Sequence, residues 1–206
     1  MSSNRPRAYL VIAVSAAAVV SSCSTEVPGQ AGPPASPSSR TDSTAGAPAG
    51  KRAPKVTRPL DAAKYIADPC ASLTQAQQGE FRVLEPGERT DINGDPNCRW
   101  QLKPDGATSV GVTYAVKVTN GLSNLYALDS TGWWKNGYFT PTTVSDYPAA
   151  YNEIADHRTQ GDCILSVAIS DSLFFSTAVR SRAGDDSCLA AKNAAAAVLD
   201  TIKKGA

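Results

Sequence analysis

The sequence predicts an α+β domain: a twisted antiparallel sheet of about five strands, with N- and C-terminal helices packed on one face and two disulfides. Three observations support this class. Residues 110–118 alternate between apolar and small or polar side chains, as a strand with one buried and one solvated face does. Three further strands follow one another closely after residue 151, and an apolar stripe with helical spacing runs through residues 188–202.

The domain is expected to begin with a helical region, about residues 61–81, that Asp68-Pro69-Cys70 interrupts. Thr74 is suited to begin the second part of this region, because its hydroxyl can accept a hydrogen bond from a backbone N–H group of the first turn. Residues 84–97 are polar and rich in turn residues, and we interpret them as a loop.

The middle of the domain contains two predicted strands and a short helix. Residues 98–103 form the first strand, and Pro104-Asp105-Gly106 turns the chain into the alternating strand, because proline presets one backbone torsion and glycine accepts a positive one. Residues 123–129 are expected to form the short helix. Residues 132–139 are an aromatic-rich loop or strand.

The C-terminal part is expected to be an antiparallel meander followed by a helix. The strands are predicted at about residues 151–157, 163–170 and 173–182, with turn residues between them. Residues 186–204 are predicted to be helical, with aspartates at the positive end of the helix dipole and lysines at the negative end. Because the apolar stripe of this helix is rich in alanine, the helix can lie close against the sheet.

The first 22 residues have the pattern of an export signal. Arg5 and Arg7 precede an apolar run, residues 8–20, which is too short to span a bilayer permanently but typical of a signal peptide. Val20-Ser21-Ser22-Cys23 then fits the lipobox pattern of bacterial lipoproteins. We therefore predict that Cys23 becomes the first residue of the mature protein and carries a diacylglyceryl membrane anchor. The alternative is an ordinary cleaved signal with an incidental cysteine.

Residues 23–58 are predicted to be a disordered linker, and residues 59–206 a globular extracytoplasmic domain. The linker is rich in Ala, Pro, Ser, Gly and Thr and has too little apolar surface to offset the entropy cost of ordering. Its end is basic, with Lys51, Arg52 and Lys55 followed by Arg58. These residues could touch anionic lipid or wall polymer, but we interpret them as part of a solvated linker.

The charge of the predicted domain bears on its partners. The whole chain has 20 basic and 19 acidic residues, whereas residues 59–206 hold 13 basic and 17 acidic ones. An acidic domain argues against nucleic acid as a partner.

The five cysteines fit an exported lipoprotein. Lipidation of Cys23 leaves an even set, Cys70, Cys98, Cys163 and Cys188, for disulfides in an oxidising compartment. Three pairings are possible, and proximity favours Cys70–Cys98 and Cys163–Cys188. A metal site is the alternative, but the chain has no Cys-x-x-Cys pair and only one histidine, so we predict no metal and no cofactor.

Several short motifs occur in a series along the domain. They are Asp68-Pro69-Cys70-Ala71-Ser72-Leu73-Thr74, Cys98-Arg99-Trp100, Tyr147-Pro148-Ala149, Asp162-Cys163 and Asp186-Ser187-Cys188. Together with the lipobox and the low-complexity linker, the series resembles the actinobacterial lipoproteins grouped as domain of unknown function 3558. The resemblance covers most of residues 64–204. It implies the same cysteine pairing and an extracytoplasmic location, and it supplies no catalytic residues.

The aromatic segment is the best candidate for binding a ligand or partner, with Trp133, Trp134 and Tyr138 as its candidate residues. Neighbouring tryptophans on a strand point to opposite faces, so one can be exposed if the other joins the core. An exposed aromatic side chain beside polar groups suits a sugar ring, a lipid or a partner protein. The alternative is that the neighbouring helix covers both tryptophans.

Catalytic signals are few. The signatures of common hydrolases and metalloproteases do not occur in the sequence, and His157 is expected to be a surface residue beside a turn. Four acids in the predicted loop could supply the carboxyl pair of a glycosidase, but we interpret them as solvating charge. They are Glu85, Glu88, Asp91 and Asp95.

We therefore expect a lipoprotein held at the cell membrane on its extracytoplasmic face. Its domain is expected to be a non-enzymatic binding module for an envelope component such as wall polymer, for a small ligand or for a partner protein. Two alternatives stay open: an envelope hydrolase that uses a carboxylate site, and a sensor or accessory subunit whose sheet edge pairs with a membrane protein.

Overall fold

The computed structural model describes residues 51–104 and 106–205 of the 206-residue chain. The predicted export signal, the predicted lipidation site Cys23 and most of the predicted linker lie outside these residues. Within the described ranges, no helix is both long and apolar enough to cross a membrane.

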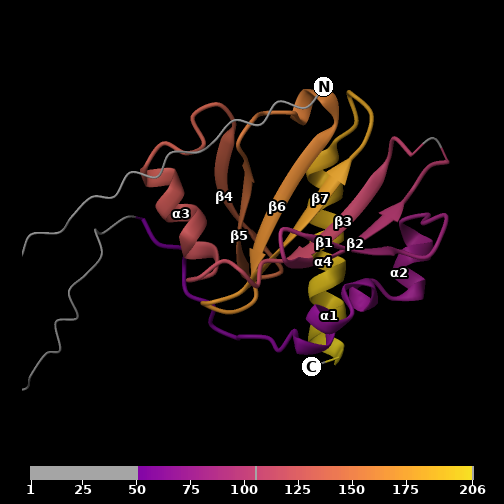
Figure 1. The fold of residues 1–206 in the computed structure, drawn as a ribbon, viewed down its shortest axis with the longest axis horizontal. Coiled ribbons are helices and arrows are strands. Elements are labelled where there is room, and N and C mark those ends of the chain that lie inside the picture. Colours follow the sequence, from indigo (N-terminus) through magenta and orange to yellow (C-terminus); the bar gives the residue numbers. More distant parts are fainter. Residues whose placement is uncertain (1–50, 105, 206) are drawn as a thin grey trace, which may run out of the picture. The chain divides into compact units, whose positions relative to one another are not determined.

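The domain is built on one antiparallel sheet of seven strands (Figure 1). The order across the sheet is β1-β2-β3-β7-β6-β5-β4, so β3 and β7, which are far apart in the sequence, lie side by side. The α+β class is thus confirmed, but the predicted number of about five strands is wrong. The strands are β1 (Glu88–Ile92), β2 (Asp95–Gln101), β3 (Ser109–Tyr114), β4 (Tyr138–Val144), β5 (Tyr147–Glu153), β6 (Asp162–Ala168) and β7 (Phe174–Arg180).

The first additional strand, β1, lies where the sequence predicts a loop. It pairs with β2 through Asn93 and Gly94, whose φ angles are 56° and 90°. Two consecutive positive φ angles are typical of the tight hairpin turn that an Asn-Gly pair favours. All five residues of β1 are exposed, so the strand has no buried face and no apolar alternation to reveal it.

The second additional strand, β4, forms the opposite edge of the sheet. It begins at Tyr138, at the end of the aromatic-rich segment, and turns into β5 through Ser145 and Asp146, which both have positive φ. Pro141 lies inside β4, and an edge strand tolerates proline because one of its sides has no partner strand. The predicted three-stranded meander is therefore part of a four-stranded one, β4 to β7.

The helices follow the predicted positions closely. They are α1 (Ala63–Ala67), η1 (Pro69–Ser72), α2 (Gln75–Glu80), α3 (Leu122–Ser130), η2 (Arg158–Gln160) and α4 (Ser187–Gly205), where η marks a 3-10 helix. Thr74 begins α2 as predicted. Its hydroxyl accepts a hydrogen bond from the N–H group of Gln77, and the Gln77 side chain accepts one from the N–H group of Thr74 at 2.8 Å.

Helix α4 packs on β6 and β7 and closes the main core. The hydroxyl of Thr177 on β7 donates a hydrogen bond to the Ala191 carbonyl on α4 at 2.9 Å. The residues of the predicted apolar stripe, from Ala191 to Ile202, are fully buried against the sheet. The largest fully buried side chains of this core include Trp100, Tyr114, Leu165, Phe175, Leu199 and Ile202.

Helix α3 packs on the other face of the sheet. Tyr138 lies on the α4 side, because its hydroxyl is 3.7 Å from the sulfur of Cys163, which is bonded to α4. Its neighbour Phe139 therefore points to the opposite face. There the Phe139 ring meets Tyr126 of α3 edge-on, with the ring centroids 4.9 Å apart.

Two disulfides join helices to the sheet, and the pairing that proximity favours is confirmed. Cys70 of η1 is bonded to Cys98 of β2, and Cys163 of β6 is bonded to Cys188 of α4. Trp100 lies in the core near the first bond. Gly87 approaches both groups so closely that an added Cβ atom would lie 2.5 Å from the Cys98 sulfur and from the Trp100 indole nitrogen.

Residues 51–60, which we call the N-terminal strap, pack on the domain although composition places most of them in the linker. Val56 is buried, and its N–H group donates to a carboxylate oxygen of Asp171 at 3.0 Å. The Leu60 N–H group donates to the Ile169 carbonyl at 2.9 Å. The strap is thus fixed mainly by hydrogen bonds of its backbone groups, which composition does not report.

Candidate functional site

The aromatic segment places its two tryptophans in different environments. Trp134 is 8 % exposed, its ring stacks on Phe139 with the centroids 5.9 Å apart, and its indole N–H donates to the Leu125 carbonyl at 3.3 Å. Trp133 is 57 % exposed. The segment consists of turns rather than a strand, yet one tryptophan belongs to the packing between α3 and the sheet while the other faces solvent.

Tyr138, the third residue of the predicted binding segment, is buried. Its hydroxyl donates to a carboxylate oxygen of Glu153 at 3.2 Å, and the guanidinium of Arg158 lies 4.1 Å from the centre of its ring. Burial raises the pKa of Tyr138 well above its usual value, so the phenol stays neutral. Of the three predicted residues, Trp133 alone is positioned to meet a ligand.

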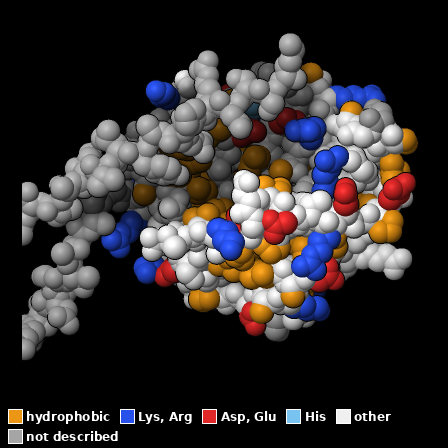
Figure 2. Space-filling view, viewed as in Figure 1, with side chains coloured by type: hydrophobic (Ala, Val, Ile, Leu, Met, Phe, Trp, Pro, Cys, Tyr) orange, Lys and Arg blue, Asp and Glu red, His pale blue; other side chains and the backbone are white. Residues whose placement is uncertain are grey.

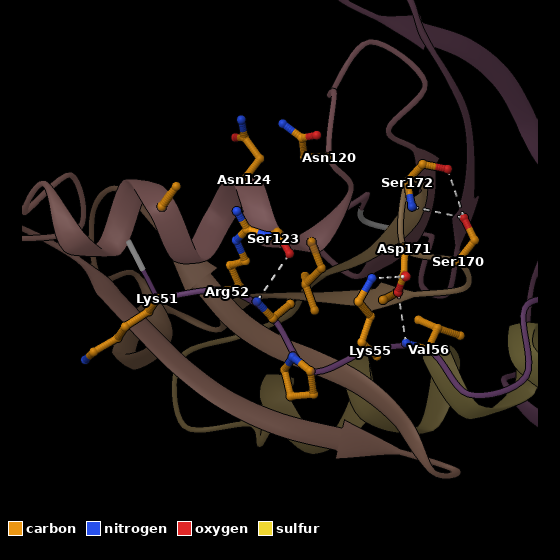
Figure 3. Close-up of a pocket in the computed structure, with 15 residues that line it drawn as sticks. Lys51, Arg52, Lys55, Val56, Asn120, Ser123, Asn124, Ser170, Asp171 and Ser172 are labelled. Carbon is orange, nitrogen blue, oxygen red and sulfur yellow. Dashed lines mark hydrogen bonds and ion pairs between the residues drawn. The ribbon is translucent and has the colours of Figure 1, made fainter. Parts of the chain in front are cut away.

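A cavity of about 630 Å³ lies between the N-terminal strap, the start of α3 and the turn that joins β6 to β7 (Figure 3). We call it the strap cavity. Its apolar lining residues include Val56, Leu122 and Ala168. Its polar lining residues are Lys51, Arg52, Lys55, Asn120, Ser123, Asn124, Ser170, Asp171 and Ser172.

Asp171, in the β6–β7 turn, fastens the strap beside this cavity. One carboxylate oxygen accepts the Val56 N–H group, and the other accepts the ammonium group of Lys55 at 2.8 Å. The hydrogen bond from Lys55, followed by that from Val56, lowers the pKa of Asp171. Further along the strap, the Ala53 N–H group donates to the Ser123 hydroxyl of α3 at 3.3 Å.

The start of α3 is brought to the cavity by an unusual backbone. Asn120 and Gly121 have φ angles of 64° and 51°. A Cβ atom added to Gly121 would lie 2.8 Å from the Asp171 carbonyl oxygen and 2.9 Å from the Leu173 nitrogen. Glycine is therefore required here both for its positive φ and for the close approach of this loop to the β6–β7 turn.

The polar lining of the strap cavity carries more positive than negative charge: three cations and one carboxylate. Lys55 is paired with Asp171, and Lys51 lies 4.0 Å from Asp129, a long pair between an exposed ammonium group and a half-buried carboxylate. Arg52 makes no ion pair within the part of the chain that the structure describes. All three cations belong to the basic stretch at the end of the predicted linker. From the sequence alone, this stretch is expected to be solvated.

The candidate hydrolytic acids do not line the strap cavity. Asp91 accepts the Gly94 N–H group in the β1–β2 turn, and Asp95 accepts the Lys117 N–H group at 2.9 Å. The strap cavity and a second cavity beside the end of α4 are lined by none of the four acids proposed from the sequence. His157 lies 3.8 Å from Glu153, and no cluster among the described residues could hold a metal ion.

The sheet face opposite α4 carries a row of hydroxyl and amide side chains. Asn97 donates to the Thr113 hydroxyl at 2.8 Å. The Ser166 hydroxyl lies 2.8 Å from both the Asn152 side-chain oxygen and the Ser176 hydroxyl. Figure 2 shows this face hollowed near its centre, with charged side chains around the hollow. Because these groups largely satisfy one another, they leave fewer free donors for a ligand than the strap cavity does.

Comparison with known proteins identifies a family. The model of the family described as Protein of unknown function (DUF3558) matches residues 18–201. No curated protein and no solved structure shows a match to this chain. The match begins within the predicted export signal and ends in α4, so it spans the strap, the whole sheet and both disulfides. The chain therefore belongs to the DUF3558 family.

Proposed function

We propose that this protein is a membrane-anchored lipoprotein of the cell envelope whose extracytoplasmic domain is a non-enzymatic binding module, and that the strap cavity is its ligand site. The observation that carries the proposal is the construction of the cavity from the N-terminal strap. This strap is the segment through which the chain leads back to the predicted anchor at Cys23.

The position of the cavity suits a ligand of the envelope. Residues 24–50 separate Cys23 from the strap, and a flexible coil of that length spans about 30 Å. The anchor would hold the ligand site close to the membrane surface and the adjacent wall. The effective concentration of an envelope ligand at the site would therefore be high. The cavity lining also combines apolar side chains with several polar ones, which is the usual composition of a small-molecule site.

The two alternative functions are less well supported. A hydrolase needs two carboxyl groups across a cleft, and two of the candidate acids, Asp91 and Asp95, accept backbone hydrogen bonds from Gly94 and Lys117. A sensor that pairs through a sheet edge needs an open edge strand. Here β4 contains Pro141, and β1 carries Glu88, Arg89 and Asp91, features that discourage pairing with another chain.

The anchor is tested by labelling cells with a fatty acid and following the protein into the membrane fraction. We expect the wild-type chain to be labelled and membrane-bound, and the Cys23→Ser variant to be neither. An unlabelled wild-type chain would refute the anchor.

The ligand site is tested by placing a photo-reactive amino acid at Asn124, which lines the cavity, and at Asn193, an exposed control on α4. Irradiation in whole cells should give an adduct of increased mass at position 124 and none at position 193. Equal labelling at the two positions, or none at either, would contradict the proposal.

A further inference from the structure

We infer that the ligand of the strap cavity carries a phosphate group on a hydroxyl-rich body, with Arg52 as the residue that binds the phosphate. The inference rests on the proposed function, because it assumes that the strap cavity is the ligand site. Its experiment is arranged so that the two can fail separately.

The first argument is local charge. Residues 51–206, the strap included, hold 17 basic and 17 acidic side chains, yet the strap cavity is lined by three cations and one acid. The positive surplus is therefore a property of this site and not of the domain as a whole. A ligand with a negative group is complementary to it.

The second argument is the availability of Arg52. Lys55 is neutralised by Asp171 at 2.8 Å, and the ammonium group of Lys51 lies 4.0 Å from the Asp129 carboxylate of α3. Arg52 instead extends towards Ser123 and has no ion pair among the described residues. A guanidinium group presents several N–H donors in a plane and can bind two phosphate oxygens at once, which an ammonium group cannot do.

The third argument is the uncharged part of the lining. Asn120, Asn124 and Ser172 place amide and hydroxyl groups around the cavity, and Asn120 and Asn124 both lie on the α3 side of it (Figure 3). Ser123 accepts a hydrogen bond from the Ala53 N–H group, so its own hydroxyl proton stays available. Such neutral donors and acceptors match the hydroxyl groups of a polyol such as glycerol or a sugar. Lipid headgroups and phosphate-containing wall polymers share this chemistry.

The test measures binding of glycerol 3-phosphate and of glycerol to the mature chain, residues 23–206 with Cys23→Ser, by isothermal titration calorimetry. We expect binding of glycerol 3-phosphate, much weaker binding of glycerol, and a loss of affinity of about tenfold or more in Arg52→Gln, because a charge-assisted pair is removed. The matched control is Arg89→Gln, which makes the same change of charge on the exposed strand β1. It should bind like the parent chain.

Co-sedimentation with vesicles distinguishes the source of the phosphate. Arg52-dependent binding to phosphatidylglycerol vesicles but not to phosphatidylcholine vesicles assigns the site to a lipid headgroup. Binding of glycerol 3-phosphate without vesicle binding assigns it to a soluble or wall-borne phosphate. Either result supports the inference.

Two results would overturn the inference. One is that neither glycerol 3-phosphate nor anionic vesicles bind, and the other is that Arg52→Gln and Arg89→Gln weaken binding equally, which would indicate a diffuse charge effect. If an adduct still forms at position 124 in cells, the cavity binds a ligand without phosphate and the proposed function stands. If no adduct forms, both fail. Circular dichroism and the melting temperature check that the Arg52→Gln chain is folded, and Arg52→Lys should keep part of the affinity.

Discussion

The packing of Val56 offers a direct way to release the strap without disturbing the sheet. Val56 is 8 % exposed and is the only strap residue in the buried core. Val56→Ala removes two methyl groups from this contact, which costs about 1.6 kcal/mol at roughly 0.8 kcal/mol per buried carbon. Because the strap is the first described segment of the domain and is not a strand of the sheet, we expect this cost to appear as local detachment rather than global unfolding.

The assay is native-state hydrogen exchange of individual backbone amides. A free-energy loss of about 1.6 kcal/mol raises the detached population about fifteenfold, so the Leu60 amide, which is bonded to Ile169, should exchange about that much faster. Amides of the β6–β7 ladder should keep their protection. The control Thr57→Ala alters an exposed neighbour and should leave both groups unchanged. If the Leu60 amide is unaffected, or if the β6 and β7 amides lose protection equally, local detachment of the strap is refuted.

Three further predictions concern the hydrogen bonds of Asp171 to the strap, the two tryptophans of the aromatic segment, and the second disulfide. The pKa of Asp171 is lowered in the folded protein, so its contribution to strap docking is present above the unfolded pKa of about 4 and is lost as pH falls through the lower folded pKa. Exchange of the Val56 amide, corrected for its intrinsic pH dependence, should therefore accelerate in the acid range. Asp171→Asn should abolish this dependence. If the exchange profile of the variant is the same as that of the wild-type chain, Asp171 does not hold the strap. Trp134→Ala should destabilise the domain by about 3–5 kcal/mol, whereas Trp133→Ala should change the unfolding free energy by less than about 0.5 kcal/mol in denaturant titrations; similar losses in both would mean that Trp133 is also core. Replacing Cys163 and Cys188 together by alanine should cost about 3.5 kcal/mol, because the bond closes a loop across a sequence separation of 25; an unchanged denaturation midpoint would argue against this account.

The sequence predicts the elements that bury a regular apolar pattern. Helix α4 is recognisable because Ala191, Ala195, Val198 and Ile202 repeat at helical spacing and are all fully buried. The start of α2 is recognisable because Thr74 and Gln77 satisfy each other's backbone groups locally. In these places short-range chemistry and tertiary packing favour the same structure.

The two additional strands lie at the edges of the sheet, where packing leaves little trace in the sequence. β1 is exposed along its whole length, so it has no apolar alternation, and Asn93-Gly94 is its one clear local signal. β4 contains Pro141 and follows a series of turns, which makes it resemble a loop. Sequence patterns report burial, and edge strands are held chiefly by backbone hydrogen bonds with a neighbour.

The candidate site was harder to predict for a related reason. The strap cavity is made by residues from the start of the domain, from the start of α3 and from the β6–β7 turn, so no single motif contains it. Its one sequence signal is the basic group Lys51, Arg52 and Lys55 within a region of linker composition. The aromatic segment gave a stronger sequence signal, but Trp134 and Tyr138 belong to the packing of the sheet. Large aromatic side chains are major components of protein cores as well as of binding sites.

The position of the first disulfide sets a limit on how the domain responds to a mechanical load. A force applied to the chain from its amino-terminal side acts first on the strap. The hydrogen bonds of the strap to Asp171 and Ile169 can then break one after another. The load then passes through α1 and meets Cys70, which is covalently fixed to β2. The segment between Lys51 and Cys70 has a length of about 65 Å when it is fully extended. Beyond that length the force is carried by the bond between Cys70 and Cys98. Stretching can therefore detach the strap, which forms one side of the strap cavity, while the sheet stays intact.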